Sequence, residues 1–129
     1  RVFLDQVVHA CGCGSVSTVW ETLSLYDTML LYYHAKHCFG MRFHSVVLQS
    51  YLNGNNYIID YTDPQTGKII GMLRQLDIWE KYKDRYFSLF DPQLSTIDFK
   101  LSETKACTIS KDVITKYKKE YVRLLTAII

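Results

Sequence analysis

The chain has 129 residues, 48% of them hydrophobic, and carries a net charge of +2. This length fits one domain spanning residues 1–129, and the apolar content excludes a disordered chain. The small net charge gives no argument for nucleic acid or a membrane surface, and no apolar run is long enough for a membrane span. We therefore expect a globular domain whose partner is neither nucleic acid nor a membrane.

The first predicted element is a helix over residues 15–34, where apolar residues recur at helical spacing. Ser15 is a competent N-cap for it, and the glycines on either side of Cys13 permit a tight turn into the helix. Residues 27–28 either interrupt this helix or begin a second one, and the sequence leaves both possibilities open.

The middle of the chain is predicted to be an antiparallel β-meander. Residues 41–51 are rich in strand formers, Asn53-Gly54 is typical of a type I′ hairpin turn, and residues 56–61 form the return strand. The order of a helix, a meander and further helices is an α+β pattern. The later predicted elements are a turn at 63–67, a strand at 68–73, a helix at 77–87, a short strand at 96–101 and a last helix starting at 110.

The four cysteines do not indicate a disulfide framework. Cys11 and Cys13 are two positions apart, and Cys38 and Cys107 are isolated in the sequence. A chain with this much apolar residue does not need disulfides for stability. We predict free thiols, which slightly favours the cytoplasm as the compartment.

Three residues suggest thiol chemistry. Cys13 lies at the predicted helix start, where free N–H groups and the helix dipole lower the pKa of a thiol and can hold an oxyanion. His44, on the predicted strand, is the candidate base, and Asp60, at the end of the return strand, is the candidate that orients the imidazole. Cys11 lies further out in the loop and is the weaker candidate nucleophile.

The carboxylate of this triad is left open between Asp60 and Asp63. A two-residue hairpin turn would place residue 63 opposite His44, whereas a one-residue bulge would bring residue 60 onto the same face. Asp63-Pro64 is also fully explained as the start of a turn. Asp60 is therefore the favoured third member.

The constellation resembles transglutaminase-like proteins. The resemblance covers residues 10–65 and rests on three stretches: Gly12-Cys13-Gly14-Ser15 before a helix, His44-Ser45-Val46-Val47-Leu48, and Leu52-Asn53-Gly54-Asn55-Asn56-Tyr57-Ile58-Ile59-Asp60. It implies a papain-like or transglutaminase-like core, in which the helix that carries the cysteine packs on an antiparallel meander. It also implies that Cys13 is the nucleophile, His44 the base and Asp60 the orienting acid.

A second resemblance is to double-glycine cysteine peptidases that process bacteriocins. It rests on His44 with Val46-Val47-Leu48, followed by Asp63-Pro64-Gln65-Thr66-Gly67. It implies that Gln6 supplies the oxyanion glutamine. Cys13 and His44 have the same roles in both resemblances.

The predicted function is a thiol-dependent hydrolase or acyltransferase that acts on an amide bond of a peptide or protein substrate and needs no cofactor or metal. Two other classes stay open. A zinc-binding domain would draw its ligands from His9, Cys11, Cys13, His34, His37 and Cys38. A non-catalytic interaction module would present an aromatic face made of Tyr82, Tyr86, Phe87, Tyr117 and Tyr121.

Overall fold

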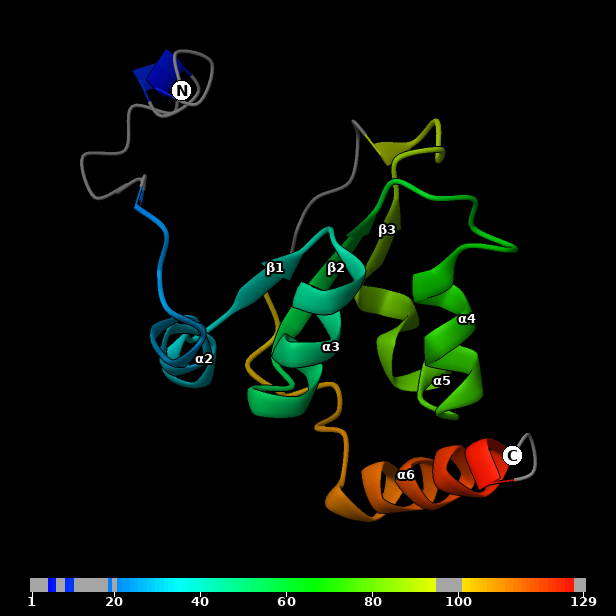
Figure 1. Ribbon diagram of the computed structural model, residues 1–129. Coiled ribbons are helices and arrows are strands. Elements are labelled where there is room, and N and C mark those ends of the chain that lie inside the picture. Colours follow the sequence, from blue (N-terminus) through cyan, green and yellow to red (C-terminus); the bar gives the residue numbers. More distant parts are fainter. Residues whose placement is uncertain (1–4, 7–8, 11–18, 20, 95–100, 127–129) are drawn as a thin grey trace.

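A computed structural model of the chain describes residues 5–6, 9–10, 19, 21–94 and 101–126 (Figure 1). Cys11, Cys13, Ser15 and nearly all of the predicted strand at 96–101 therefore lie outside the described residues. The elements in chain order are α2 (Leu25–His34), β1 (Cys38–Gly40), α3 (Phe43–Leu52), β2 (Asn56–Asp60), α4 (Lys68–Gln75), α5 (Trp79–Tyr82), η1 (Lys83–Arg85), β3 (Tyr86–Ser88) and α6 (Lys111–Thr126).

The strands form one three-stranded sheet in the order β1-β2-β3, and both strand pairs are parallel. Parallel neighbours cannot be joined by a tight turn and need a crossover connection. Here α3 connects β1 to β2, and α4, α5 and η1 connect β2 to β3. The predicted antiparallel meander is therefore wrong, and so is the predicted arrangement of a helix packed on such a meander.

The segment predicted as the first strand of the meander is helix α3. Its buried residues are Val46, Gln49 and Ser50, and Phe43 packs against the core one turn before Val46. This spacing is helical and places all four residues on one face. Gln49 and Ser50 are polar, so the hydrophobic pattern does not reveal the inner face of the helix.

The Asn53-Gly54 pair ends α3 and makes no hairpin. Gly54 has a φ of 73°, and the N–H groups of Asn53 and Gly54 donate to the Gln49 carbonyl at 2.9 and 3.0 Å. This is the left-handed glycine cap of a helix C-terminus. The Gly54 carbonyl also accepts from the Ala106 N–H at 2.9 Å, and a Cβ at position 54 would lie 2.8 Å from the Cys107 carbonyl oxygen.

The predicted third strand at 68–73 is also a helix, α4. Its buried residues Ile69, Ile70 and Leu73 have helical spacing, and the short length of the apolar run concealed this. The predicted helix at 77–87 is shorter than expected, because the chain leaves α5 and η1 and enters β3 at Tyr86.

Three other predictions are closer to the structure. The return strand predicted at 56–61 is β2, and the predicted last helix is α6, where Ser110 Oγ accepts from the Val113 N–H at 3.3 Å. The helix predicted at 15–34 is confirmed from Leu25 to His34 and is wrong for residues 21–24, which are described and not helical. The N-cap of α2 is Ser24, whose Oγ accepts from the Asp27 N–H at 3.1 Å. Residues 27–28 lie inside α2, so they neither interrupt that helix nor begin it.

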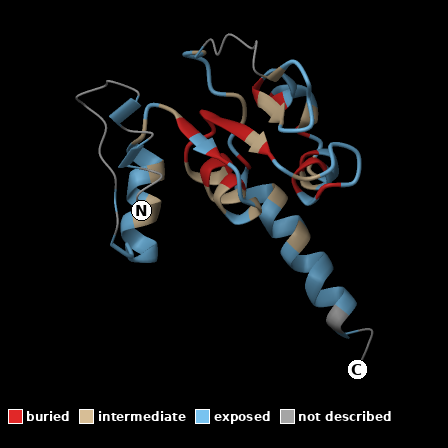
Figure 2. Cartoon of the chain, turned by 90° about the horizontal axis from the view of Figure 1, so that it is seen from above, coloured by how far each residue is buried: buried red, intermediate tan, exposed pale blue. Residues whose placement is uncertain are grey.

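The core lies between the sheet and helices α3, α4 and α5, which appear red on their inner faces in Figure 2. By contrast, α2 and α6 lie at the periphery, and α2 contains no buried residue. In the part of the chain that the structure describes, no helix has both the length and the apolar character of a membrane span. The core residues are Val46, Ile58, Ile69, Leu73, Ile78, Tyr82 and Ile109.

Candidate functional site

His44, the predicted base, lies in the first turn of α3 and not on a strand. Its side chain is exposed, and its ring meets the edge of the Phe43 ring with a centroid distance of 5.6 Å. The structural setting that favoured His44 from the sequence, a strand through the core, is therefore wrong.

Asp60, the predicted orienting acid, ends β2 and is fully buried, with 0% of its surface exposed. One carboxylate oxygen accepts from the Thr62 N–H at 2.8 Å and from the Thr62 hydroxyl at 2.7 Å. The other accepts from the Tyr86 hydroxyl at 2.9 Å. Burial, and then this bond to Asp60, raise the pKa of Tyr86. Both oxygens of Asp60 thus already have structural partners.

Asp63, the alternative acid, is exposed and organises the turn before α4. Its Oδ1 accepts from the N–H groups of Gln65 and Thr66 at 2.8 and 2.9 Å, and these bonds hold the pKa of Asp63 below its usual value. This is the turn-starting role that the sequence indicated.

The predicted triad is only partly within the described residues, because Cys13 lies outside them. Among the residues described, no hydrogen bond joins His44 to Asp60 or to Asp63. Since α3 starts just after β1 and Asp60 ends β2, His44 and Asp60 both belong to the carboxyl edge of the sheet. Gln6 is exposed.

Two of the zinc candidates within the described residues, Cys38 and His37, have contacts with other groups. The Cys38 thiol is buried and lies 3.8 Å from the Tyr32 carbonyl oxygen, whereas His37 Nδ1 lies 3.1 Å from the amide nitrogen of Asn55. Burial raises the pKa of the Cys38 thiol, which makes it a poor nucleophile and metal ligand. Within the described ranges, no group of three His, Cys, Asp or Glu residues is placed to hold a metal ion. Of the predicted aromatic partner face, Tyr82 belongs to the core.

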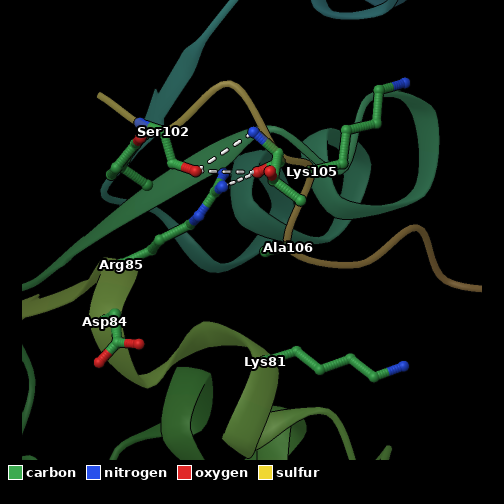
Figure 3. Close-up of a pocket in the computed structure, with 8 residues that line it drawn as sticks. Lys81, Asp84, Arg85, Ser102, Lys105 and Ala106 are labelled. Carbon is green, nitrogen blue, oxygen red and sulfur yellow. Dashed lines mark hydrogen bonds between the residues drawn. The ribbon is translucent and has the colours of Figure 1, made fainter. Parts of the chain in front are cut away.

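A different site lies toward the amino ends of the strands, where a cavity of about 510 Å³ opens beside β2 (Figure 3). One wall comes from α5 and η1, and the other comes from residues 101–110, which we call the return segment. The lining residues are Tyr57, Lys81, Asp84, Arg85, Ser102, Thr104, Lys105 and Ala106.

Arg85 is the central residue of this pocket and is only 6% exposed. Its guanidinium donates to Asn55 Oδ1 at 2.7 Å and to the Thr104 carbonyl, and its Cζ lies 5.1 Å from the centre of the Tyr57 ring. All of these partners are neutral. No carboxylate in the described part of the chain forms an ion pair with Arg85, and Figure 3 shows the Asp84 side chain directed away from the guanidinium.

The groups around Arg85 are themselves held in place. Asn55 donates through its amide nitrogen to the Lys36 carbonyl at 2.6 Å, which fixes the oxygen that Arg85 uses. The Tyr57 hydroxyl accepts from the Ser102 N–H at 2.6 Å and so ties the return segment to β2. The pocket is therefore preorganised around a buried positive charge.

Two lysines add positive charge at the opening. Lys81 comes from α5 and Lys105 from the return segment, and Ala106 lies between the two (Figure 3). Together with Arg85 they outnumber the one lining carboxylate, Asp84. The arrangement can bind an anion through charge-assisted hydrogen bonds.

Sequence reasoning did not find this site. Arg85 and Lys81 lie in a run of charged residues that looks like an ordinary solvated helix face. The sequence held one local signal, the close spacing of Asn53, Asn55 and Asn56. These amides are buried, and buried amides need polar partners, so they indicate a polar site nearby.

Comparison of the chain with models of known families, with curated proteins and with solved structures finds no match in any of the three. The chemistry of the pocket itself is therefore the basis for a functional inference.

Proposed function

We propose that this domain is a binding module for an anionic ligand, which carries phosphate or carboxylate groups and occupies the pocket at Arg85. The observation that carries the proposal is the buried guanidinium of Arg85, which has no carboxylate counter-ion among the described residues.

A buried charge is unfavourable unless it is paired and hydrogen-bonded. The charge of Arg85 has only neutral partners, namely the Asn55 side chain, the Thr104 carbonyl and the Tyr57 ring. A guanidinium has more N–H donors than these acceptors use. Its remaining donors can form a paired contact with a carboxylate or phosphate, the geometry for which arginine is best suited.

The lysines favour a ligand with more than one negative charge. Lys81 and Lys105 line opposite walls of the pocket, and Figure 3 shows both side chains extended away from the Arg85 guanidinium. Both are long and exposed, so each can turn toward an anion that is bound at Arg85. This role belongs to the class of interaction modules. The thiol-dependent hydrolase stays a prediction, because Cys13 lies outside the described residues and no contact among those described links His44 to Asp60.

Thermal unfolding with and without inorganic tripolyphosphate tests the proposal. Ligand at about 100 times its Kd stabilises the folded state by about 2.7 kcal/mol, so the Tm of the wild-type protein should rise. Lys81→Ala and Lys105→Ala should each weaken the stabilisation several-fold, because each removes one charge from the opening. Lys119→Ala, at an exposed position of α6 outside the pocket, is the matched control and should respond like the wild type.

Arg85→Met should abolish the stabilisation, but this variant also removes a buried structural contact and lowers stability by itself. The lysine variants avoid that difficulty. Equal stabilisation of Lys81→Ala, Lys105→Ala and the wild type would show that the anion binds elsewhere.

A further inference from the structure

An exposed aromatic ring lies next to the cationic pocket, on the face of the sheet opposite the core helices. Phe39 of β1 and Tyr57 of β2 are register partners, and their rings stack with centroids 5.1 Å apart and planes 19° apart. The next residue of β2, Ile58, packs into the core with α3 and α4, and successive side chains of a strand point to opposite faces. Phe39 and Tyr57 therefore belong to the outer face.

The two rings differ in how much of their surface is free. Tyr57 is 2% exposed, whereas Phe39 is 48% exposed at the edge strand. Arg85 lies just before β3, on the side of β2 away from β1, and its Cζ is 5.1 Å from the Tyr57 ring centre. Tyr57 is thus held between Phe39 and the guanidinium. The exposed part of the Phe39 ring and the anion pocket therefore lie on either side of the Tyr57 ring.

We propose that the anionic ligand of this module is single-stranded nucleic acid, with a base stacked on Phe39 and a backbone phosphate at Arg85, Lys81 and Lys105. This inference rests on the proposed function, since it uses the same pocket. Aromatic side chains that stack bases beside a basic groove are the common basis of single-strand binding. The net charge of +2, which gave no argument for nucleic acid, is a total over the chain, whereas Lys81, Arg85 and Lys105 all line one pocket.

The geometry favours a strand over a smaller or a different anion. Tyr57 separates Phe39 from Arg85, so the base and the phosphate that bind have to lie on either side of a buried ring. An oligonucleotide can span that separation, because it repeats bases and phosphates along one backbone. An acidic or phosphorylated peptide would satisfy Arg85 and the lysines but would have no aromatic base to stack on Phe39.

Charges of both signs lie around Phe39 and the pocket. Lys36 forms an exposed ion pair with Glu103 at 2.9 Å, and His37 lies with its ring centre 6.1 Å from that of Tyr57. The groups on this side therefore include carboxylates, Glu103 and Asp84, as well as cations. Stacking provides no base-specific hydrogen bonds, so we expect binding to be sequence-tolerant. Because the phosphate is held by cationic side chains, we expect binding to weaken strongly with added salt.

The inference can be tested by fluorescence anisotropy of a labelled oligothymidylate mixed with the full chain. The oligomer has about 10 nucleotides, which is within the usual site size. The comparison probe is an abasic oligomer of the same length and charge. The oligothymidylate should bind about 10-fold more tightly than the abasic oligomer, because base–aromatic stacking has an effect of this order.

Phe39→Leu keeps an apolar side chain at the site and removes the aromatic face. It should weaken oligothymidylate binding about 10-fold and leave abasic binding unchanged. Phe90→Leu changes another exposed aromatic residue, outside the pocket, and should bind like the wild type.

The outcomes separate the two proposals. If both oligomers bind equally and Phe39→Leu has no effect, or if a phosphorylated peptide binds more tightly than the oligothymidylate, the nucleic-acid inference is overturned. Tripolyphosphate binding that depends on Lys81 and Lys105 would still support the proposed function in that case. If neither tripolyphosphate nor either oligomer binds at low salt, both proposals fail.

Discussion

The two ends of the parallel sheet differ in how completely their charged groups are satisfied. At the carboxyl end of β2, Asp60 is buried and both its oxygens accept hydrogen bonds from Thr62 and Tyr86. At the amino end, Arg85 is also buried but has neutral partners and lines a cavity. Open α/β sheets usually bind ligands at the carboxyl ends of their strands. Here the cavity and the side chain that can still bind a ligand lie at the amino ends of the strands. The hydrogen bonding of individual charged side chains therefore indicates the binding site better than this general rule does.

The strongest test of this contrast compares one buried polar residue at each end. Asn56, at the amino end, donates to Ser50 Oγ at 3.1 Å and accepts from the Tyr82 hydroxyl at 2.8 Å. Asn56→Ala should lower the free energy of unfolding by about 3 kcal/mol, because it breaks both bonds in a dry environment. Urea unfolding followed by circular dichroism measures the change.

Asp60→Asn is the matched variant at the carboxyl end. An asparagine keeps the oxygen that Thr62 uses, and its NH₂ can donate to the Tyr86 hydroxyl, so the loss should be only about 1 kcal/mol. A loss as large as that of Asn56→Ala would mean that the negative charge of Asp60 is itself required.

The two ends of the sheet can also be compared through the pH dependence of stability, because Tyr82 lies at the amino end and Tyr86 bonds to Asp60 at the carboxyl end. Burial raises the pKa of Tyr82, at the amino end, to about 12. In the unfolded chain a tyrosine titrates near pH 10, so the folded state keeps this phenol protonated where the unfolded state loses the proton. The stabilisation is fully present below about pH 10 and is lost as the pH rises through about 12, a change of about 2–3 kcal/mol.

Urea unfolding at several pH values between 9 and 12 (about the range set by the two pKa values) measures this effect. Tyr82→Phe should flatten the decline of stability over that interval. The pKa of Tyr86 is also raised, but its side chain is only half-buried, so Tyr86→Phe should flatten the decline less. Equal slopes for both variants would contradict the difference between the two ends.

The smallest expected effect concerns the thiol chemistry predicted from the sequence. If His44 activates Cys13 as the sequence predicts, iodoacetamide at pH 6 (about one unit or more below the pKa of a free thiol) should label Cys13 faster than Cys107. His44→Ala should remove the difference, and mass spectrometry identifies the labelled residue. Equal labelling of Cys13 and Cys107, unchanged in His44→Ala, would exclude the predicted nucleophile.

Some of the fold could be predicted because it follows from local chemistry. The apolar run of β2, the apolar stripe of α6 and the turn at Asp63 all match the structure. The identity of α3 could not be predicted from hydrophobicity, because Gln49 and Ser50 occupy its buried face. Asn53-Gly54 correctly indicated a left-handed backbone, but a helix cap and a hairpin turn both use one.

The candidate site was harder to predict than the fold. The burial of Arg85 results from Asn55, Tyr57 and Thr104, which come from different parts of the chain. The stretch of mixed charge at residues 80–85, with two lysines and two carboxylates beside Arg85, gives no local sign that the arginine is buried. The role of Phe39 was likewise not predicted, because β1 falls between the helix predicted at 15–34 and the strand predicted at 41–51.

The cap at Gly54 also has a consequence for the order of folding. Its carbonyl receives the Ala106 N–H, and the Ser102 N–H reaches the Tyr57 hydroxyl, 45 residues earlier in the chain. Contacts of such separation require a long loop to close, which is slow compared with the formation of α3 or its neighbouring strands. We therefore expect one wall of the pocket to form after the sheet when the chain folds.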